Sequence, residues 1–117
     1  IHGGFYRNYL NVSECCSAIR FLMTFANETK YNIGSNKNYR FCDLIEYCAD
    51  KLESKGKISG CEPSNFHKII QTPSFRMDAS KLRDLGFEWK KTIWETLDEI
   101  LDSKNDEILE NLPKPSI

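Results

Sequence analysis

Residues 6–26 read YRNYLNVSECCSAIRFLMTFA, and this stretch decides the fold class. Aromatic and β-branched residues alternate with polar ones over residues 6–12, which predicts a short β-strand. Ser13 then supplies a hydroxyl that can cap a helix, and apolar residues recur at helical spacing as far as Ala26. We therefore predict a strand that leads directly into a helix over residues 13–26, as in mixed α/β proteins.

Strand-like alternation and helical spacing also occur after residue 26. Short aromatic and β-branched runs beside turn residues predict strands at 30–35, 39–41 and 75–77. Helical spacing predicts helices at 42–54, at 79–85 between Asp78 and Gly86, and after Thr92, where Glu95 completes a capping box. Residues 66–70 fit a strand or a helical turn equally well. The predicted fold is α/β (mixed α+β), a small lobe of short strands and three main helices.

The helical spacing also predicts the core. The apolar faces consist of Cys15, Ala18, Ile19, Leu22, Met23 and Ala26 in the first helix, Leu44, Ile45, Cys48, Ala49 and Leu52 in the second, and Ile93, Leu97, Ile100 and Leu101 in the third. We expect these faces to pack together.

Length and charge limit the classes of function. The chain has 117 residues and a formal net charge of −1, with no apolar run long enough for a transmembrane helix. A near-neutral chain has no strong field that attracts nucleic acid or an anionic membrane, so we expect neither as a partner. We predict one domain over residues 1–112 and a disordered tail over 113–117.

Five cysteines are present, an odd number without a C-x-x-C pair: Cys15, Cys16, Cys42, Cys48 and Cys61. This spacing lacks the ligand clips of a zinc site, and it predicts small buried thiols in a reducing, cytoplasmic setting. No G-x-G-x-x-G or P-loop occurs, and no nucleophile–base pair stands out. We therefore assign no catalytic, metal-binding or cofactor-binding residue.

Cationic side chains are the strongest site candidates. Arg7 and Arg76 lie in separate predicted strands, and Lys68 lies between them in an irregular region. Such groups suit a diphosphate, because guanidinium groups pair with two phosphate oxygens at once. Asn11 adds a hydrogen-bonding group for a sugar. The alternative is that each arginine is a surface residue paired with a nearby carboxylate.

Four motifs in order resemble the extended short-chain dehydrogenase/reductases, the NAD(P)-dependent sugar-nucleotide epimerases and dehydratases. Residues 7–14, RNYLNVSE, resemble their R-D-[FY]-[IVL]-x-V-x-D strand and helix start. Residues 31–35, YNIGS, resemble their Y-N-[IV]-G-[SG] turn. Residues 78–87, DASKLRDLGF, resemble D-x-S-K-x-x-x-L-G-[WF], and residues 92–101 resemble the helix that follows.

The resemblance covers only the C-terminal, substrate-binding lobe of that family. It implies that this chain is the C-terminal part of a longer polypeptide, packed on a Rossmann domain that holds NAD or NADP and the catalytic Tyr and Lys. It also implies a nucleotide-sugar substrate, a keto-sugar intermediate, Arg7 as a nucleotide contact, and a homodimer formed through the missing half. An alternative is a non-catalytic module that binds a nucleotide sugar or a protein.

Overall fold

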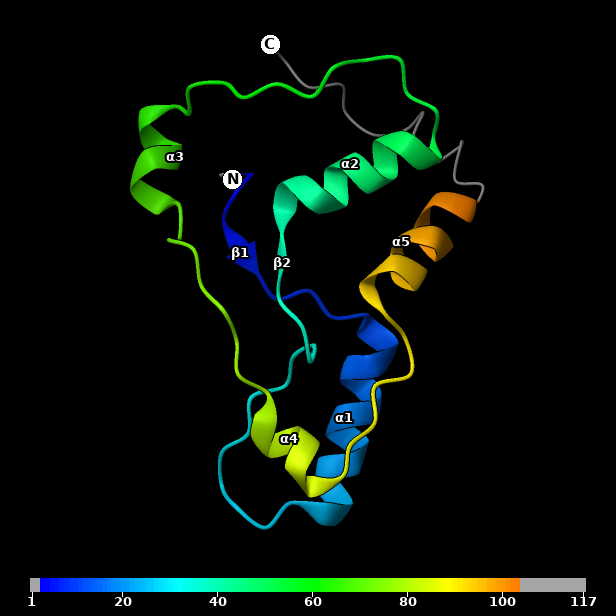
Figure 1. Cartoon of the computed structure of the whole chain (residues 1–117). Coiled ribbons are helices and arrows are strands. Elements are labelled where there is room, and N and C mark those ends of the chain that lie inside the picture. The colour runs from blue at the N-terminus through cyan, green and yellow to red at the C-terminus, as the bar shows by residue number, and fades with distance from the viewer. Residues whose placement is uncertain (1–2, 104–117) are drawn as a thin grey trace.

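The computed structural model describes residues 3–103, which form a mixed α/β arrangement (Figure 1). In order, its elements are β1 (Tyr6–Arg7), α1 (Val12–Phe25), β2 (Tyr39–Arg40), α2 (Phe41–Lys51), α3 (Asn65–Ile70), α4 (Ser80–Leu85) and α5 (Ile93–Asp102). The long helices α1, α2 and α5 match the three predicted ones. Within residues 3–103 no helix has the length and apolarity needed to cross a bilayer. The turn predicted after Ser103 and the tail at 113–117 lie outside the described residues.

The only sheet among the described residues is the antiparallel pair β1–β2. Tyr6 pairs with Arg40 and Arg7 with Tyr39, and β2 runs directly into α2. The strands predicted at 30–35 and 75–77 do not form. Side-chain amides take the place of strand partners there: Asn38 Oδ1 accepts from the Met77 N–H at 3.0 Å and Asn38 Nδ2 donates to Met77 O at 3.2 Å.

Helix α1 begins earlier than predicted because Asn11, not Ser13, is its N-cap. The Asn11 Oδ1 atom accepts from the Ser13 N–H at 2.8 Å. The other predicted helix ends are confirmed in part. Thr92 caps α5 by accepting from the Glu95 N–H at 3.2 Å, and Gly86 ends α4 at a φ of 112°, a conformation that favours glycine. The N-cap residue of α4 is Ala79, one residue after Asp78. Hydrogen bonds from the Ser80 side chain and from the Ser80 N–H lower the pKa of the Asp78 carboxyl.

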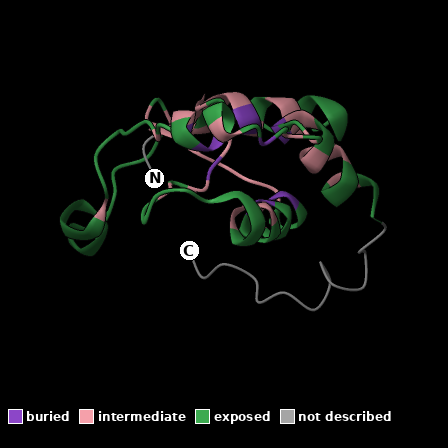
Figure 2. Ribbon diagram, turned by 90° about the horizontal axis from the view of Figure 1, so that it is seen from below, coloured by how far each residue is buried: buried purple, intermediate pink, exposed green. Residues whose placement is uncertain are grey.

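The main core lies where α1 crosses α4. Ala18, Leu82 and Phe87 are buried there, and Phe21, Leu22, Ile33 and Trp89 pack around them. The predicted faces are only partly right, since Ile19, Met23, Leu52 and Ile100 are exposed. No cysteine is fully buried: Cys16 and Cys61 are exposed and the other three are half-buried thiols without a disulfide. Figure 2 shows how little of the chain is buried.

The overall shape is open. The Cα radius of gyration is 17.2 Å, against about 13 Å for a compact domain of 100 residues. Every residue over 51–70 is exposed, including all of α3. This helix lies between the long segment that leaves α2 and the long segment that leads to α4 (Figure 1). Residues 66–70, whose sequence fits a strand or a helical turn equally well, belong to this helix, and Ser64 caps it.

A second contact joins α2 to α5. Asp98 Oδ1 accepts from the Tyr47 hydroxyl at 2.6 Å and lies 2.7 Å from Lys51 Nζ. These hydrogen bonds lower the pKa of Asp98, while the bond to Asp98 raises the pKa of both Lys51 and Tyr47. The Trp94 ring lies 4.9 Å from the Tyr47 ring on the same side, so polar and aromatic contacts reinforce each other.

We expect Leu82→Ala to destabilise the chain by about 2–5 kcal/mol, because it empties the most buried site of the main core. Urea unfolding followed by circular dichroism measures the change. Leu52→Ala is the matched control, since Leu52 is 61% exposed, and it should shift the midpoint little. Equal effects of the two substitutions would contradict the assigned core.

The α2–α5 contact predicts a pH dependence. The pKa of Asp98 is lowered from 3.8 on folding, so its stabilising effect is present above that value and is lost as pH falls through the lower folded pKa. Asp98→Asn should therefore reduce stability at pH 7 and make little difference near pH 2 in urea titrations. The control is Asp50→Asn, an exposed acid on α2 without a side-chain bond among residues 3–103. A gap between wild type and Asp98→Asn that persists at pH 2 would contradict the prediction.

Candidate functional site

Arg7 is held in place by backbone oxygens. Its Nη1 donates to Tyr6 O at 2.8 Å and to Pro73 O at 3.0 Å, and its Nη2 donates to Thr72 O. The guanidinium also lies against two rings, with Cζ 5.1 Å from the Phe75 centroid and 5.6 Å from the Phe5 centroid. These contacts fix the direction of a side chain that would otherwise sample many rotamers.

The returning segment 72–76 lies beside β1. The Phe75 N–H donates to Tyr6 O at 3.2 Å and the Tyr6 N–H donates to Ser74 Oγ at 2.8 Å. Arg76 then places its Cζ 4.0 Å from the centroid of the Tyr6 ring. The structure therefore brings Arg7 and Arg76 into neighbouring segments, although the chain separates them by 69 positions.

Neither arginine forms the ion pair that the alternative interpretation requires. Among residues 3–103, no carboxylate lies within salt-bridge distance of Arg7 or Arg76. The interpretation of both as surface arginines paired with a carboxylate is therefore wrong for the described part of the chain.

The two guanidinium groups nevertheless do not converge. Successive side chains of a strand point to opposite faces. Because Tyr6 and Arg7 are adjacent in β1, the Arg76–Tyr6 contact and the Arg7–Phe75 contact fall on opposite sides of the ribbon. Arg7 and Arg76 are therefore separate candidates for a binding role.

Asn11 and Lys68 have other partners. Asn11 uses its oxygen as the cap of α1 and donates from Nδ2 to Thr96 Oγ1 at 3.0 Å, which ties α1 to α5. Lys68 lies on α3, 3.5 Å from Glu62. Within residues 3–103 no hydrogen bond or ring contact joins either residue to Arg7. Of the four predicted site residues, Arg7 is the one whose surroundings favour a binding role most clearly.

One buried charge was not anticipated. Glu14 is 4% exposed, and its Oε1 accepts from the Lys90 N–H at 3.2 Å. The spacing of Asn11 and Glu14 is that of a capping box, which would have located both the helix start and this carboxylate. Glu14 connects α1 to the segment before α5, and that role is structural.

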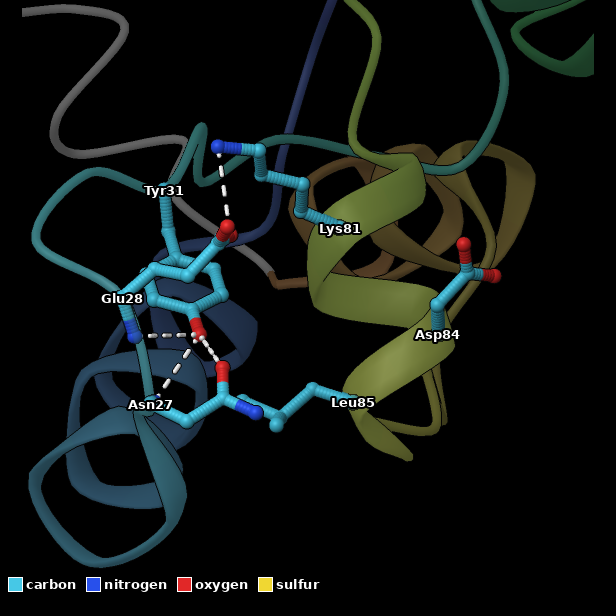
Figure 3. A pocket seen from close by; sticks show the side chains of 6 residues that line it. All are labelled: Asn27, Glu28, Tyr31, Lys81, Asp84 and Leu85. Carbon is cyan, nitrogen blue, oxygen red and sulfur yellow. Dashed lines mark hydrogen bonds and ion pairs between the residues drawn. The ribbon is translucent and has the colours of Figure 1, made fainter.

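Two cavities open on the described surface. The larger has a volume of about 390 Å³ and lies between α4 and the loop after α1 (Figure 3). Its Tyr31 hydroxyl accepts from the Asn27 and Glu28 N–H groups and donates to Asn27 Oδ1, while Lys81 lies 3.2 Å from Glu28. Its polar groups thus satisfy one another, and it offers little to a ligand.

The smaller cavity has a volume of about 150 Å³ and lies between residues 35–39 and 89–94. We call it the lysine–tryptophan cavity, after the Lys37, Lys90, Lys91, Trp89 and Trp94 side chains that line it with Tyr39. No acidic residue lines it. Both tryptophans are half-buried.

No metal site is found in the described part of the chain: no group of three or more His, Cys, Asp or Glu side chains there could hold an ion. Comparison with known proteins adds no assignment, because no family model, curated protein or solved structure matches the chain. The candidate site therefore depends on its own geometry.

We expect Arg7→Ala to release segment 72–75 from β1, since the contacts of Arg7 with Thr72 O, Pro73 O and the Phe75 ring are lost together. A hydrogen bond to a charged group contributes about 1.5–3 kcal/mol, so amide exchange at Phe75 should accelerate by at least about tenfold. Hydrogen exchange followed by NMR measures this. Arg83→Ala, at an exposed arginine on α4 paired with Asp84, should leave Phe75 unchanged; equal acceleration would contradict the assigned role.

Proposed function

We propose that this chain is the nucleotide-sugar-binding part of an NAD(P)-dependent sugar-nucleotide epimerase or dehydratase, with Arg7 as the contact to the nucleotide. The observation that carries this proposal is the state of Arg7. Its guanidinium is fixed by carbonyls and rings and has no acidic partner among residues 3–103.

Arg7 retains hydrogen-bonding capacity for an anion. Three of its five N–H groups donate to carbonyls within the described residues: both on Nη1 and one on Nη2. The Nε hydrogen and one Nη2 hydrogen have no acceptor among residues 3–103. Guanidinium donors of this kind bind phosphate oxygens. Because the guanidinium is already held in place, little side-chain entropy is lost on binding.

The four motif segments also pack on one another, which supports the family resemblance. Asn8 in the first segment accepts from the Ser35 N–H at 2.8 Å in the second. Asn32 in the second donates to Asp78 O at 3.0 Å in the third. The Asn11–Thr96 bond joins the first segment to the fourth. Hydrogen bonds thus connect all four motif segments within the lobe.

An exposed apolar stripe on α1 supports the second half of the proposal, a Rossmann domain in the same polypeptide. Val12, Cys16, Ile19 and Met23 recur every three or four residues on the side away from the core, with Val12 76% and Met23 84% exposed. A helix that is apolar on both sides is normally buried in a larger structure. The open shape of the lobe fits the same explanation.

The chemistry of the reaction would reside in the other domain. NAD or NADP supplies hydride transfer when bound there, and no residue of this chain is assigned to it. The lobe contributes binding energy at the nucleotide, remote from the reacting carbon, and this energy orients the sugar toward the cofactor. No catalytic acid or base is assigned to residues 1–117.

The test uses the longer polypeptide that the proposal requires. Arg7→Ala should raise KM for the nucleotide sugar by about tenfold or more, because a charge-assisted contact contributes about 1.5–3 kcal/mol, and should leave cofactor affinity unchanged. Arg83→Ala is the matched control, since it removes an arginine charge at an exposed position on α4, where Arg83 pairs with Asp84 and does not contact Arg7. An equal rise in KM for the control, or none for Arg7→Ala, would refute Arg7 as a ligand contact.

Nucleotide-sugar titration of the 117-residue chain, beside the longer polypeptide, distinguishes the enzyme from the alternative, a non-catalytic binding module. Binding that needs the Rossmann domain supports the enzyme. Tight binding by the isolated chain supports a non-catalytic module.

A further inference from the structure

The lysine–tryptophan cavity differs from the other surface hollow in its charge. Three lysines and no acidic residue line it, whereas the cavity around Tyr31 contains Glu28, Asp84 and one lysine already paired with Glu28. Among residues 3–103, no carboxylate lies within salt-bridge distance of Lys37 or Lys90. Lys91 is held by Glu99 at 2.9 Å. Lys37 and Lys90 therefore line one small hollow, and neither side chain forms an ion pair among residues 3–103.

The aromatic walls of this cavity are held in place by neighbours. Trp89 donates from Nε1 to Gly34 O at 2.8 Å and packs edge-on against Phe87. Trp94 lies between two rings, 5.5 Å from Tyr39 and 4.9 Å from Tyr47. A cavity with such walls is preformed, and binding there requires little reorganisation.

We propose that the lysine–tryptophan cavity binds the phosphate group of a small molecule through Lys37 and Lys90. Lysine binds phosphate as a compact charge with rotatable donors, which suits an approach from two loops. The volume of about 150 Å³ holds one such group, and it is smaller than the roughly 300 Å³ or more of pockets that enclose a whole organic ligand. This site is separate from Arg7, which lies beside segment 72–76.

A polyanion is a poor fit. Helix α5 begins at the cavity and carries Glu95, Asp98, Glu99 and Asp102. A nucleic-acid backbone laid across the site would approach these carboxylates, whereas a single phosphate would not extend along the helix. The ligand is therefore inorganic phosphate or a small phosphate ester, and either source uses the same two ammonium groups.

Both tryptophans of the chain line the cavity, so their indole N–H signals report on this site. The experiment titrates the 117-residue chain with inorganic phosphate and with ribose 5-phosphate, at constant ionic strength kept with sodium chloride, and follows the two indole resonances by NMR. We expect saturable shifts at millimolar ligand. Tighter binding of the ester would assign an organic phosphate; equal binding would assign free phosphate.

Lys37→Gln combined with Lys90→Gln should raise Kd by about tenfold or more, since two charge-assisted contacts are lost. Lys81→Gln is the control: it removes the same kind of charge near the other cavity and should leave Kd unchanged. Circular dichroism checks that each variant is folded, and each single substitution is measured beside the pair. Absence of saturable shifts up to about 50 mM, or an equal loss in Lys81→Gln, would overturn the proposal.

Discussion

Asparagine side chains hold together segments that share almost no backbone ladder. Asn8 donates to Ser35 O at 2.9 Å and accepts from the Ser35 N–H, so one side chain pairs with a backbone as a strand neighbour would. Asn38 does the same for Met77. Buried N–H and C=O groups need partners. With only one two-stranded sheet among residues 3–103, these amides satisfy groups that a wider sheet would otherwise pair.

This arrangement also explains a glycine. A Cβ at Gly34 would meet Asn8 Oδ1 at 2.7 Å and would also clash with Met77 Sδ. The Asn8 amide reaches the Ser35 backbone because Gly34 has no side chain to block it. The Gly34 carbonyl in turn accepts from Trp89. The core at α1 and α4 and the cavity beside Trp94 both border this junction, so their geometry depends on the same close approach.

The predictable part of the fold was the part governed by local rules. Helical spacing and capping residues located α1, α2, α4 and α5 to within a few residues, because those signals lie within each helix. The predictions of strands at 30–35 and 75–77 were wrong. Alternating residues indicate an extended chain, but they do not show which segment, if any, forms backbone hydrogen bonds with it. An extended segment such as 75–77 lies beside β1, yet a hydroxyl and an amide take some of the ladder positions.

The candidate site shows the same limit. The sequence indicated Arg7 and Arg76 as cations on extended segments, and the structure places these segments side by side. The sequence could not indicate that Arg7 lies against Phe75 on one face while Arg76 lies against Tyr6 on the other. That arrangement depends on the register between distant segments. Lys37 and Lys90 were missed for a related reason. Each is an ordinary surface lysine in the sequence, and only the approach of two loops brings them to one cavity.

Exposed apolar residues and a long exposed segment give this lobe its open shape. A chain of this size ordinarily encloses one core, yet α1 leaves an apolar stripe outside and all of residues 51–70 lie in solvent. The part-buried hydrogen bonds of Asn8, Asn11 and Asn38 fix distant segments to one another. The structure is thus specified by hydrogen bonds within the lobe, while its outer apolar faces remain available to be covered. The exposed apolar stripe on α1 is the surface that the proposed second domain would cover.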